Sequence, residues 1–187
     1  MRYNDDEHLR RFGSGTFPTI HDDIFTMFVS NVLGQSVLDL GCCFGLLGER
    51  IARAGWRAVG VDALAWQLDK GRAAGVTIPL FQLKVGENTL ADLLRLVAEH
   101  AVDTVVARRS LCVILAGKQK HEANEPLAAA LARGLAERGV RELVIQGMAP
   151  DPRAVAALKS VDDEIAILAP AFALAQRRGE VAYLRAV

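Results

Sequence analysis

Hydrophobic residues in this chain form short runs that alternate with segments in which apolar positions recur every three or four residues. Short runs rich in Val, Ile and Leu predict buried strands, and the three-to-four-residue spacing predicts amphipathic helices. The predicted strands are 36–40, 57–61, 77–83, 102–106 and 142–146. The predicted helices are 22–33, 45–54, 64–74, 90–97 and 127–135. This alternation is typical of βαβ units with right-handed crossovers, and it predicts a mostly parallel sheet.

Residues that interrupt the apolar pattern indicate where elements begin and end. Glycine favours the left-handed conformation that often follows a helix. The glycines expected to end helices are Gly34, Gly55, Gly75 and Gly139. Asn88 or Thr89 is expected to cap the helix over 90–97. Pro79 falls inside the predicted strand 77–83, and because proline has no N–H to donate, that strand is expected at a sheet edge.

The C-terminal part of the chain departs from the alternation. Residues 152–168 have helical spacing with a break at Ser160, and the segments 172–176 and 181–185 flank a polar, glycine-containing turn. The predicted fold class is therefore α/β, with a mostly parallel seven-stranded sheet, helices on both faces and a C-terminal antiparallel hairpin. We expect one domain over 1–187. Its parts are an N-terminal loop and helix (1–35), a cofactor-binding core (36–147) and a C-terminal helix and hairpin (148–187).

Composition narrows the class of protein. Of 187 residues, 51% are hydrophobic and 24% charged, and the formal net charge is +0, so no global charge favours nucleic acid or an anionic membrane. The longest apolar run, 165–175, contains Pro170 and is too short to span a bilayer. The polar, acidic N-terminus resembles neither a signal nor a transit peptide. Three cysteines predict a reducing, cytoplasmic location, and the excess of arginine over lysine favours a bacterial source.

Candidate chemistry lies where the first two predicted strands end. The first strand runs into Gly41 and Gly45, which allow close approach of the backbone to a ligand before the next helix begins. Asp62 ends the second strand about 20 residues later, where a carboxylate can accept hydrogen bonds from both hydroxyls of a ribose. These features predict a cofactor that contains a nucleoside.

The residues around these glycines argue against a nicotinamide cofactor. The dinucleotide fingerprint GxGxxG fails when read from Gly41, because Cys43 and Leu46 stand where glycines are required. The tyrosine–lysine pair of short-chain dehydrogenases is missing, since the only tyrosines are Tyr3 and Tyr183. Asp39 lies two residues before the first glycine, at a position that is usually apolar in nicotinamide-binding folds.

Residues 37–45, VLDLGCCFG, resemble motif I of the class I S-adenosylmethionine-dependent methyltransferases, and 59–62, VGVD, are similar to the second motif of that family. The resemblance covers roughly 22–147 and implies S-adenosylmethionine as cofactor and S-adenosylhomocysteine as product. It implies that Asp39 helps to hold the methionine amino group and that Asp62 binds the ribose hydroxyls. The residues it places along the methionine and ribose are Gly41, Cys42, Cys43 and Gly45, and those it places against adenine are Ala63 and Leu64.

Two positions depart from the family pattern. Cys43 replaces the middle glycine of motif I, and a cysteine is expected to exclude the conformation that glycine readily adopts there. The family often has an acid near the adenine amine at the end of the third strand, where this chain has Gln82, Leu83 and Lys84. That contact is therefore expected from the backbone or from Gln82.

The sequence contains no recognisable motif that identifies the methyl acceptor. The fourth strand ends at Arg108 and Arg109, without the DPPY-type motif of adenine-amine methyltransferases, a Pro-Cys pair or paired acids for a metal. An arginine can orient a carboxylate or phosphate through two hydrogen bonds, so these two residues are candidate contacts for a small, anionic acceptor. The alternative is that both are solvated or paired with Glu122 or Glu125. No residue is assigned a catalytic role.

Other interpretations stay open at this point. The chain is alternatively a non-catalytic module that binds S-adenosylmethionine or S-adenosylhomocysteine, or, less favoured, a nicotinamide-binding oxidoreductase. Cys42 and Cys43 with Cys112 or His121 are poorly spaced for a metal site, so no metal is expected. His121 is expected to be solvent-exposed. Trp66 is expected to pack on the sheet, and contact with adenine is the alternative. The oligomeric state is not predicted.

Overall fold

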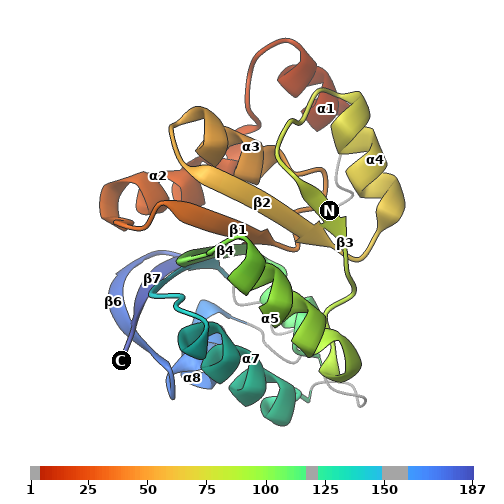
Figure 1. Ribbon diagram of the computed structural model, residues 1–187. Helices are drawn as coiled ribbons and strands as arrows, with labels where there is room; N and C mark the ends of the chain where they lie inside the picture. The colour runs from red at the N-terminus through yellow and green to blue at the C-terminus, as the bar shows by residue number, and fades with distance from the viewer. Residues whose placement is uncertain (1–4, 117–121, 149–159) are drawn as a thin grey trace.

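The computed structural model describes residues 5–116, 122–148 and 160–187 and contains a seven-stranded sheet in the order β3-β2-β1-β4-β5-β7-β6 (Figure 1). The strands are β1 (Ser36–Leu40), β2 (Arg57–Asp62), β3 (Leu80–Gln82), β4 (Thr104–Arg108), β5 (Glu142–Gln146), β6 (Phe172–Arg178) and β7 (Val181–Ala186). Strands β1 to β5 are parallel, and β7 pairs antiparallel with both β5 and β6. The predicted fold class is confirmed.

Helices cover both faces of the sheet (Figure 1). The α-helices are α1 (Asp5–Gly13), α2 (Asp22–Asn31), α3 (Leu46–Arg53), α4 (Ala65–Ala73), α5 (Leu90–Glu99), α6 (Leu111–Ile114), α7 (Glu125–Glu137) and α8 (Val161–Leu168). Two 3-10 turns, η1 (Thr19–His21) and η2 (Glu87–Thr89), precede α2 and α5. Helices α1 to α4 lie on one side of the sheet in Figure 1, and α5, α7 and α8 lie on the other. The short helix α6 was not predicted, because one helical turn is too short to have a detectable period.

The central strands contribute to two hydrophobic cores, because successive side chains of a strand point to opposite faces. In β1, Val37 packs with Phe28 on the α2–α4 side, and Leu38 belongs to the core that contains Leu131 of α7. Val37, Leu38 and Phe28 are all fully buried. Burial on both faces explains why the parallel strands appear in the sequence as continuous apolar runs.

Strand β3 is shorter than predicted. It begins after Pro79, because the N–H groups of Thr77 and Ile78 donate to the buried Glu49 carboxylate at 2.8 and 3.3 Å rather than to a neighbouring strand. The carbonyl of Pro79 accepts from the Gly60 N–H at 2.8 Å. The edge position predicted from this proline is confirmed by the strand order.

Three of the four predicted helix terminators are confirmed. They follow α3, α4 and α7 with φ angles of +110°, +97° and +92°, and they are Gly55, Gly75 and Gly139. Gly34 does not terminate α2, which ends at Asn31 and is followed by extended Val32. A Cβ at Gly34 would lie 2.1 Å from Asp103 Oδ1, so close packing against β4 is what requires glycine here.

The cap predictions are confirmed in part. Thr89 is the N-cap residue of α5, but its hydroxyl donates to the Lys84 carbonyl at 2.7 Å instead of accepting from the helix. Ser160 begins α8 with a capping box that includes Asp163, so the predicted break is a helix start. The rest of the predicted helix, 152–159, lies outside the described residues, as does His121.

Candidate functional site

The turn between β1 and α3 has a backbone that few residues tolerate. Gly41, Cys43 and Gly45 have φ angles of +75°, +55° and +77°. A Cβ at Gly41 would lie 2.3 Å from Ser110 Cβ, so there is no room for a side chain at position 41. The expectation that cysteine excludes the glycine conformation is wrong, because Cys43 adopts it. Such a conformation costs a non-glycine residue about 1–2 kcal/mol and persists only where its surroundings hold it.

Asp62, at the end of β2, holds this turn in place. Its Oδ2 accepts the Cys43 N–H at 2.8 Å, and its Oδ1 accepts the Leu64 N–H at 3.0 Å. A carboxylate has about four acceptor sites, so each oxygen keeps capacity for a further donor. The carboxylate therefore fixes the loops after β1 and β2 and can still bind a ligand that carries two hydroxyl groups.

Asp39 lies inside β1 with its carboxyl group buried. Its Oδ2 accepts the Gly48 N–H of α3 at 2.9 Å. Burial raises the pKa of Asp39 to about 7, and the nearby Asp62 charge raises it further, whereas the Gly48 hydrogen bond and the Arg108 charge oppose the shift. A ligand cation placed beside Asp39 would favour the ionised carboxylate.

Two adjoining cavities open at the carboxyl ends of β1, β2 and β4. The first, the Asp39 cavity, has a volume of about 320 Å³, and the second, the Leu64 cavity, has about 390 Å³. The Asp39 cavity is lined by His21, Asp39, Gly41, Cys42, Cys43, Leu47, Trp66, Gln67, Arg108 and Arg109. The side chains that make the Leu64 cavity largely apolar are Leu64, Leu83, Val85, Val113 and Ile114. Four residues line both: Gly41, Gln67, Arg108 and Arg109.

The structure brings most of the predicted site residues together. Those along the Asp39 cavity are Asp39, Gly41, Cys42 and Cys43, and those along the Leu64 cavity are Asp62, Ala63 and Leu64. Gly45 and Gln82 line neither. Gly45 faces Leu80, whose Cδ2 lies 2.8 Å from where a Cβ would be. Gln82 Nε2 donates to the Ala63 carbonyl at 3.5 Å, outside the cavity.

Sequence reasoning missed residues that reach the cavities from elsewhere in the chain. Ser110, Val113 and Ile114 come from the start of α6, and only their place directly after the fourth predicted strand could have suggested them. His21 reaches the Asp39 cavity from η1, and a single histidine before a helix gives no sequence signal. Its Nδ1 is buried and has no partner among the described residues. Burial, followed by the charge of Arg108, lowers the pKa of His21 to about 3, so the ring is neutral at pH 7.

Trp66 does not pack on the sheet, so that prediction is wrong. Its side chain is 47% exposed at the Asp39 cavity. One ring edge meets Phe44, with centroids 6.2 Å apart, and the Lys70 ammonium lies 5.5 Å from the ring centroid. Trp66 is the second residue of α4, which begins shortly after β2 ends at Asp62.

The two arginines at the end of β4 have different partners. Arg108 Nε donates to the Ile20 carbonyl at 3.1 Å, and Arg109 Nη2 pairs with Glu180 Oε2 at 3.2 Å. The predicted alternative partners of these arginines, Glu122 and Glu125, do not pair with Arg109. Both arginines line the two cavities described above and also a third.

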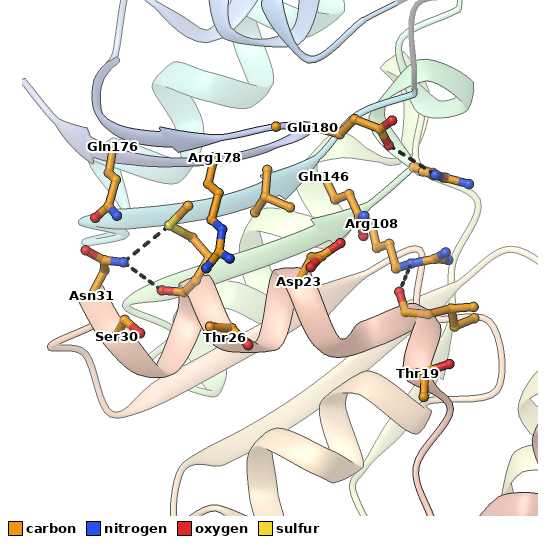
Figure 2. A pocket seen from close by; sticks show the side chains of 15 residues that line it. Thr19, Asp23, Thr26, Ser30, Asn31, Arg108, Gln146, Gln176, Arg178 and Glu180 are labelled. Atoms are coloured by element: carbon orange, nitrogen blue, oxygen red, sulfur yellow. Dashed lines mark hydrogen bonds and ion pairs between the residues drawn. The ribbon is translucent and has the colours of Figure 1, made fainter.

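The third cavity, which we call the α2 groove, lies between α2 and the β5, β6 and β7 strands and has a volume of about 590 Å³ (Figure 2). Thr19, Asp23, Thr26 and Ser30 approach it from η1 and α2, and Gln146, Gln176 and Arg178 approach it from the sheet (Figure 2). Arg108 and Arg109 line both this groove and the Asp39 cavity, so the two cavities are neighbours that share these side chains as a wall.

Cys42 and Cys112 are buried, and Cys43 is partly buried. Burial raises the pKa of the Cys42 thiol well above its usual value, and burial also raises that of Cys112. No group of three or more metal-binding side chains occurs within 5–116, 122–148 and 160–187. Over the same ranges, no helix has the length and apolar character needed to cross a membrane.

Comparison of the sequence with protein-family models and with curated proteins finds no match. Solved structures do match the fold. A TehB-like SAM-dependent methyltransferase from Corynebacterium glutamicum has a TM-score of 0.64 and 17% identity, with 98% of this chain and 97% of that chain covered. The magnesium protoporphyrin IX methyltransferase from Synechocystis PCC 6803, a structure with bound SAH, has a TM-score of 0.61 and 21% identity over 100% of this chain and 89% of its own. The PH0226 protein from Pyrococcus horikoshii has a TM-score of 0.60 and 11% identity over 90% of each chain. The chain therefore has the fold shared by these structures.

Proposed function

We propose that this protein, which has the fold of class I S-adenosylmethionine-dependent methyltransferases, binds S-adenosylmethionine at the carboxyl edge of its sheet and transfers the methyl group to a small acceptor. One observation carries the proposal. Asp62 fixes a glycine-containing turn, and beside that turn two cavities adjoin, one of them apolar and the other containing a buried carboxyl group.

The residues present fit this cofactor by the chemistry of their groups. The Leu64 cavity offers apolar walls for the adenine, and Asp62 offers free acceptor capacity to the ribose hydroxyls. Asp39 offers a buried carboxylate to the methionine ammonium group. Gly41 leaves open the space that a Cβ would fill, so the cofactor can lie directly against the backbone.

When bound, S-adenosylmethionine supplies a methyl group that its sulfonium already activates. The chain's own residues then have to bind the cofactor and the acceptor, orient the two toward each other and exclude water. Arg108 and Arg109 lie between the proposed cofactor cavity and the α2 groove, where they can orient an acceptor. The α2 groove is large enough for a small-molecule acceptor, which favours an enzyme over a module that only binds the cofactor.

The experiment is calorimetric titration of wild-type protein and the Asp62→Ala variant with S-adenosylhomocysteine. Hydrogen bonds to a charged group contribute about 1.5–3 kcal/mol, and about 1.4 kcal/mol corresponds to a tenfold change in affinity. We therefore expect Asp62→Ala to bind about ten- to a hundredfold more weakly.

Asp69→Ala is the matched control, because Asp69 is an exposed acid that pairs with Arg72 on the surface of α4. The thermal unfolding temperature of each variant separates loss of ligand contacts from loss of the turn that Asp62 holds. Equal affinity of Asp62→Ala and wild type would refute the ribose assignment, and binding of NADH in preference to S-adenosylhomocysteine would refute the proposed cofactor.

A further inference from the structure

The α2 groove contains a buried polar atom that has no partner within the protein. Gln146, the last residue of β5, is 5% exposed, and its Oε1 accepts no hydrogen bond from the described residues. Buried carbonyl oxygens are nearly always hydrogen-bonded, so the Gln146 side chain, which lines the groove, keeps an acceptor for a donor that enters there. Figure 2 shows this side chain pointing from the sheet toward α2.

The groove also contains two opposite charges that the described protein does not use. Arg178, at the end of β6, and Asp23, in the first turn of α2, both line it and form no ion pair with a described residue. Figure 2 shows the Arg178 guanidinium extending down to α2, and Asp23 projecting from α2 toward Gln146. An unpaired guanidinium favours an anion, whereas a carboxylate beside an amide oxygen favours a hydrogen-bond donor.

We propose that the α2 groove binds the methyl acceptor, and that this acceptor is a small organic anion that also carries an O–H or N–H group. Arg178 binds its carboxylate or phosphate. Gln146 Oε1 and the Asp23 carboxylate accept from its O–H or N–H group. This inference rests on the proposed function, because it assigns the groove to the acceptor by its connection to the Asp39 cavity through Arg108 and Arg109.

The position of these groups agrees with such a role. Gln146 pairs in register with Arg108, and its carbonyl accepts the Arg109 N–H at 2.7 Å, so the amide side chain stands beside the wall that separates the groove from the proposed cofactor cavity. The donor group of the ligand is therefore held at the end of the groove nearest that cavity. Arg178 lies farther along α2, where it binds the opposite end of the ligand (Figure 2).

The test uses aromatic probes that differ by one group. 4-Hydroxybenzoate, 4-aminobenzoate and 4-hydroxyphenyl phosphate carry an anion and a donor, benzoate lacks the donor, and methyl 4-hydroxybenzoate lacks the anion. Each is titrated into the full-length protein, with and without S-adenosylhomocysteine, and binding is followed by NMR. We expect at least one of the first three to bind at least tenfold more tightly than both comparators, and the carboxylate and phosphate arms identify the anion.

Variants then locate the probe. Arg178→Gln should weaken binding of the anionic probes at least tenfold and leave methyl 4-hydroxybenzoate unchanged. Asp23→Asn and Gln146→Leu should weaken the donor-bearing probes more than benzoate. Arg133→Gln, an exposed arginine of α7 on the opposite face of the sheet, is the matched control and should have no effect.

The inference is overturned if none of the three donor-bearing anions binds, if both comparators bind equally well, or if Arg178→Gln leaves anion affinity unchanged. Its failure is separable from that of the proposed function. Loss of S-adenosylhomocysteine binding alone refutes the cofactor assignment, whereas probe titrations without that ligand still report on the groove.

Discussion

Cys43 occupies a backbone position whose conformation favours glycine. Its φ of +55° lies in the left-handed region, and its N–H donates to Asp62. The hydrogen bond and the neighbouring glycines impose this conformation, although the side chain disfavours it. The strain is local, and glycine at this position would remove it.

We therefore expect Cys43→Gly to raise the free energy of unfolding. Relief of the left-handed strain is worth about 1–2 kcal/mol, and the extra freedom of glycine in the unfolded chain removes about 0.5–1 kcal/mol, which leaves a gain of up to about 1.5 kcal/mol. Urea denaturation measures it. Cys42→Gly is the matched control and should be destabilising, because Cys42 is buried in the core. A destabilised Cys43→Gly would mean that the thiol makes contacts worth more than the strain.

Asp39 makes the stability of the folded protein depend on pH, and the direction of that dependence follows from its pKa. Its pKa is about 7 in the folded protein, against 3.8 for an unperturbed aspartate side chain. The folded state therefore holds the proton more tightly, so the contribution of Asp39 to stability falls as pH rises from about 4 to 7 and stays constant above that. Asp39→Asn, which keeps an oxygen for the Gly48 N–H, should remove this contribution.

Unfolding temperatures of wild type and Asp39→Asn at pH 5 and pH 8 test this prediction. We expect the variant to lose less stability between the two pH values than wild type does. Glu164, whose burial also raises its pKa to about 7, contributes with the same sign in both proteins and cancels in the comparison. An identical pH response of the two proteins would contradict the assignment to Asp39.

At the scale of elements, the β1–α3 turn depends on its packing against the start of α6. Ser110 Oγ donates to the Leu40 carbonyl at 2.6 Å, and Ser110 occupies the space where a Gly41 side chain would be. Two loops that follow non-consecutive strands are thereby fixed against each other. This packing keeps both cavities open beside the turn.

Gly41→Ala should therefore destabilise the protein more than the cost of a left-handed alanine alone, which is about 1–2 kcal/mol. Gly139→Ala is the matched control, because Gly139 also has a positive φ but has open space around the position of a Cβ. We expect Gly41→Ala to show the larger loss by urea denaturation and to lose S-adenosylhomocysteine binding, and Gly139→Ala to retain that binding. Equal losses of stability would show that Ser110 moves aside.

At the scale of the whole molecule, the buried Glu142 joins segments that are distant in sequence. Its carboxylate accepts the Leu33 and Gly34 N–H groups, with Gly34 at 2.8 Å, and the Tyr183 hydroxyl at 2.5 Å. The link before β1, the start of β5 and the last strand therefore meet at one carboxylate. This meeting holds α2 over β5 and β7, and the α2 groove runs along the helix between them.

Tyr183→Phe removes one of these hydrogen bonds without changing the shape of the core. A hydrogen bond to a charged group contributes about 1.5–3 kcal/mol, so we expect a loss of that size in the free energy of unfolding by urea denaturation. Thr104→Val is the comparator, because its hydroxyl lies 3.0 Å from Asp103 Oδ1 and 3.3 Å from the Glu142 carboxylate, so its loss should matter less to Glu142. A loss below about 0.5 kcal/mol for Tyr183→Phe would contradict the role assigned to Glu142.

The sequence by itself determined the order of the seven strands along the chain, most of the helices between them and the turn that carries the candidate site. Burial of β1 on both faces makes its apolar run continuous. Asp39, Gly41 and Asp62 could be identified as candidate site residues because they lie at the ends of two strands that are close in the chain. These features are local, because residue periodicity and short spacings record them directly.

Only the tertiary structure decided the features that depend on contacts between distant segments. Position 34 requires glycine because Asp103, which directly precedes β4, packs against it. Strand β3 begins after Pro79 because the Glu49 carboxylate of α3 accepts the N–H group of Thr77. The α2 groove joins Asp23 to Arg178, more than 150 residues away in sequence. The periodicity of apolar residues shows which face of a helix or strand is buried, but it does not show which distant element covers that face. These contacts can therefore be identified only when the order of the strands in the sheet is known.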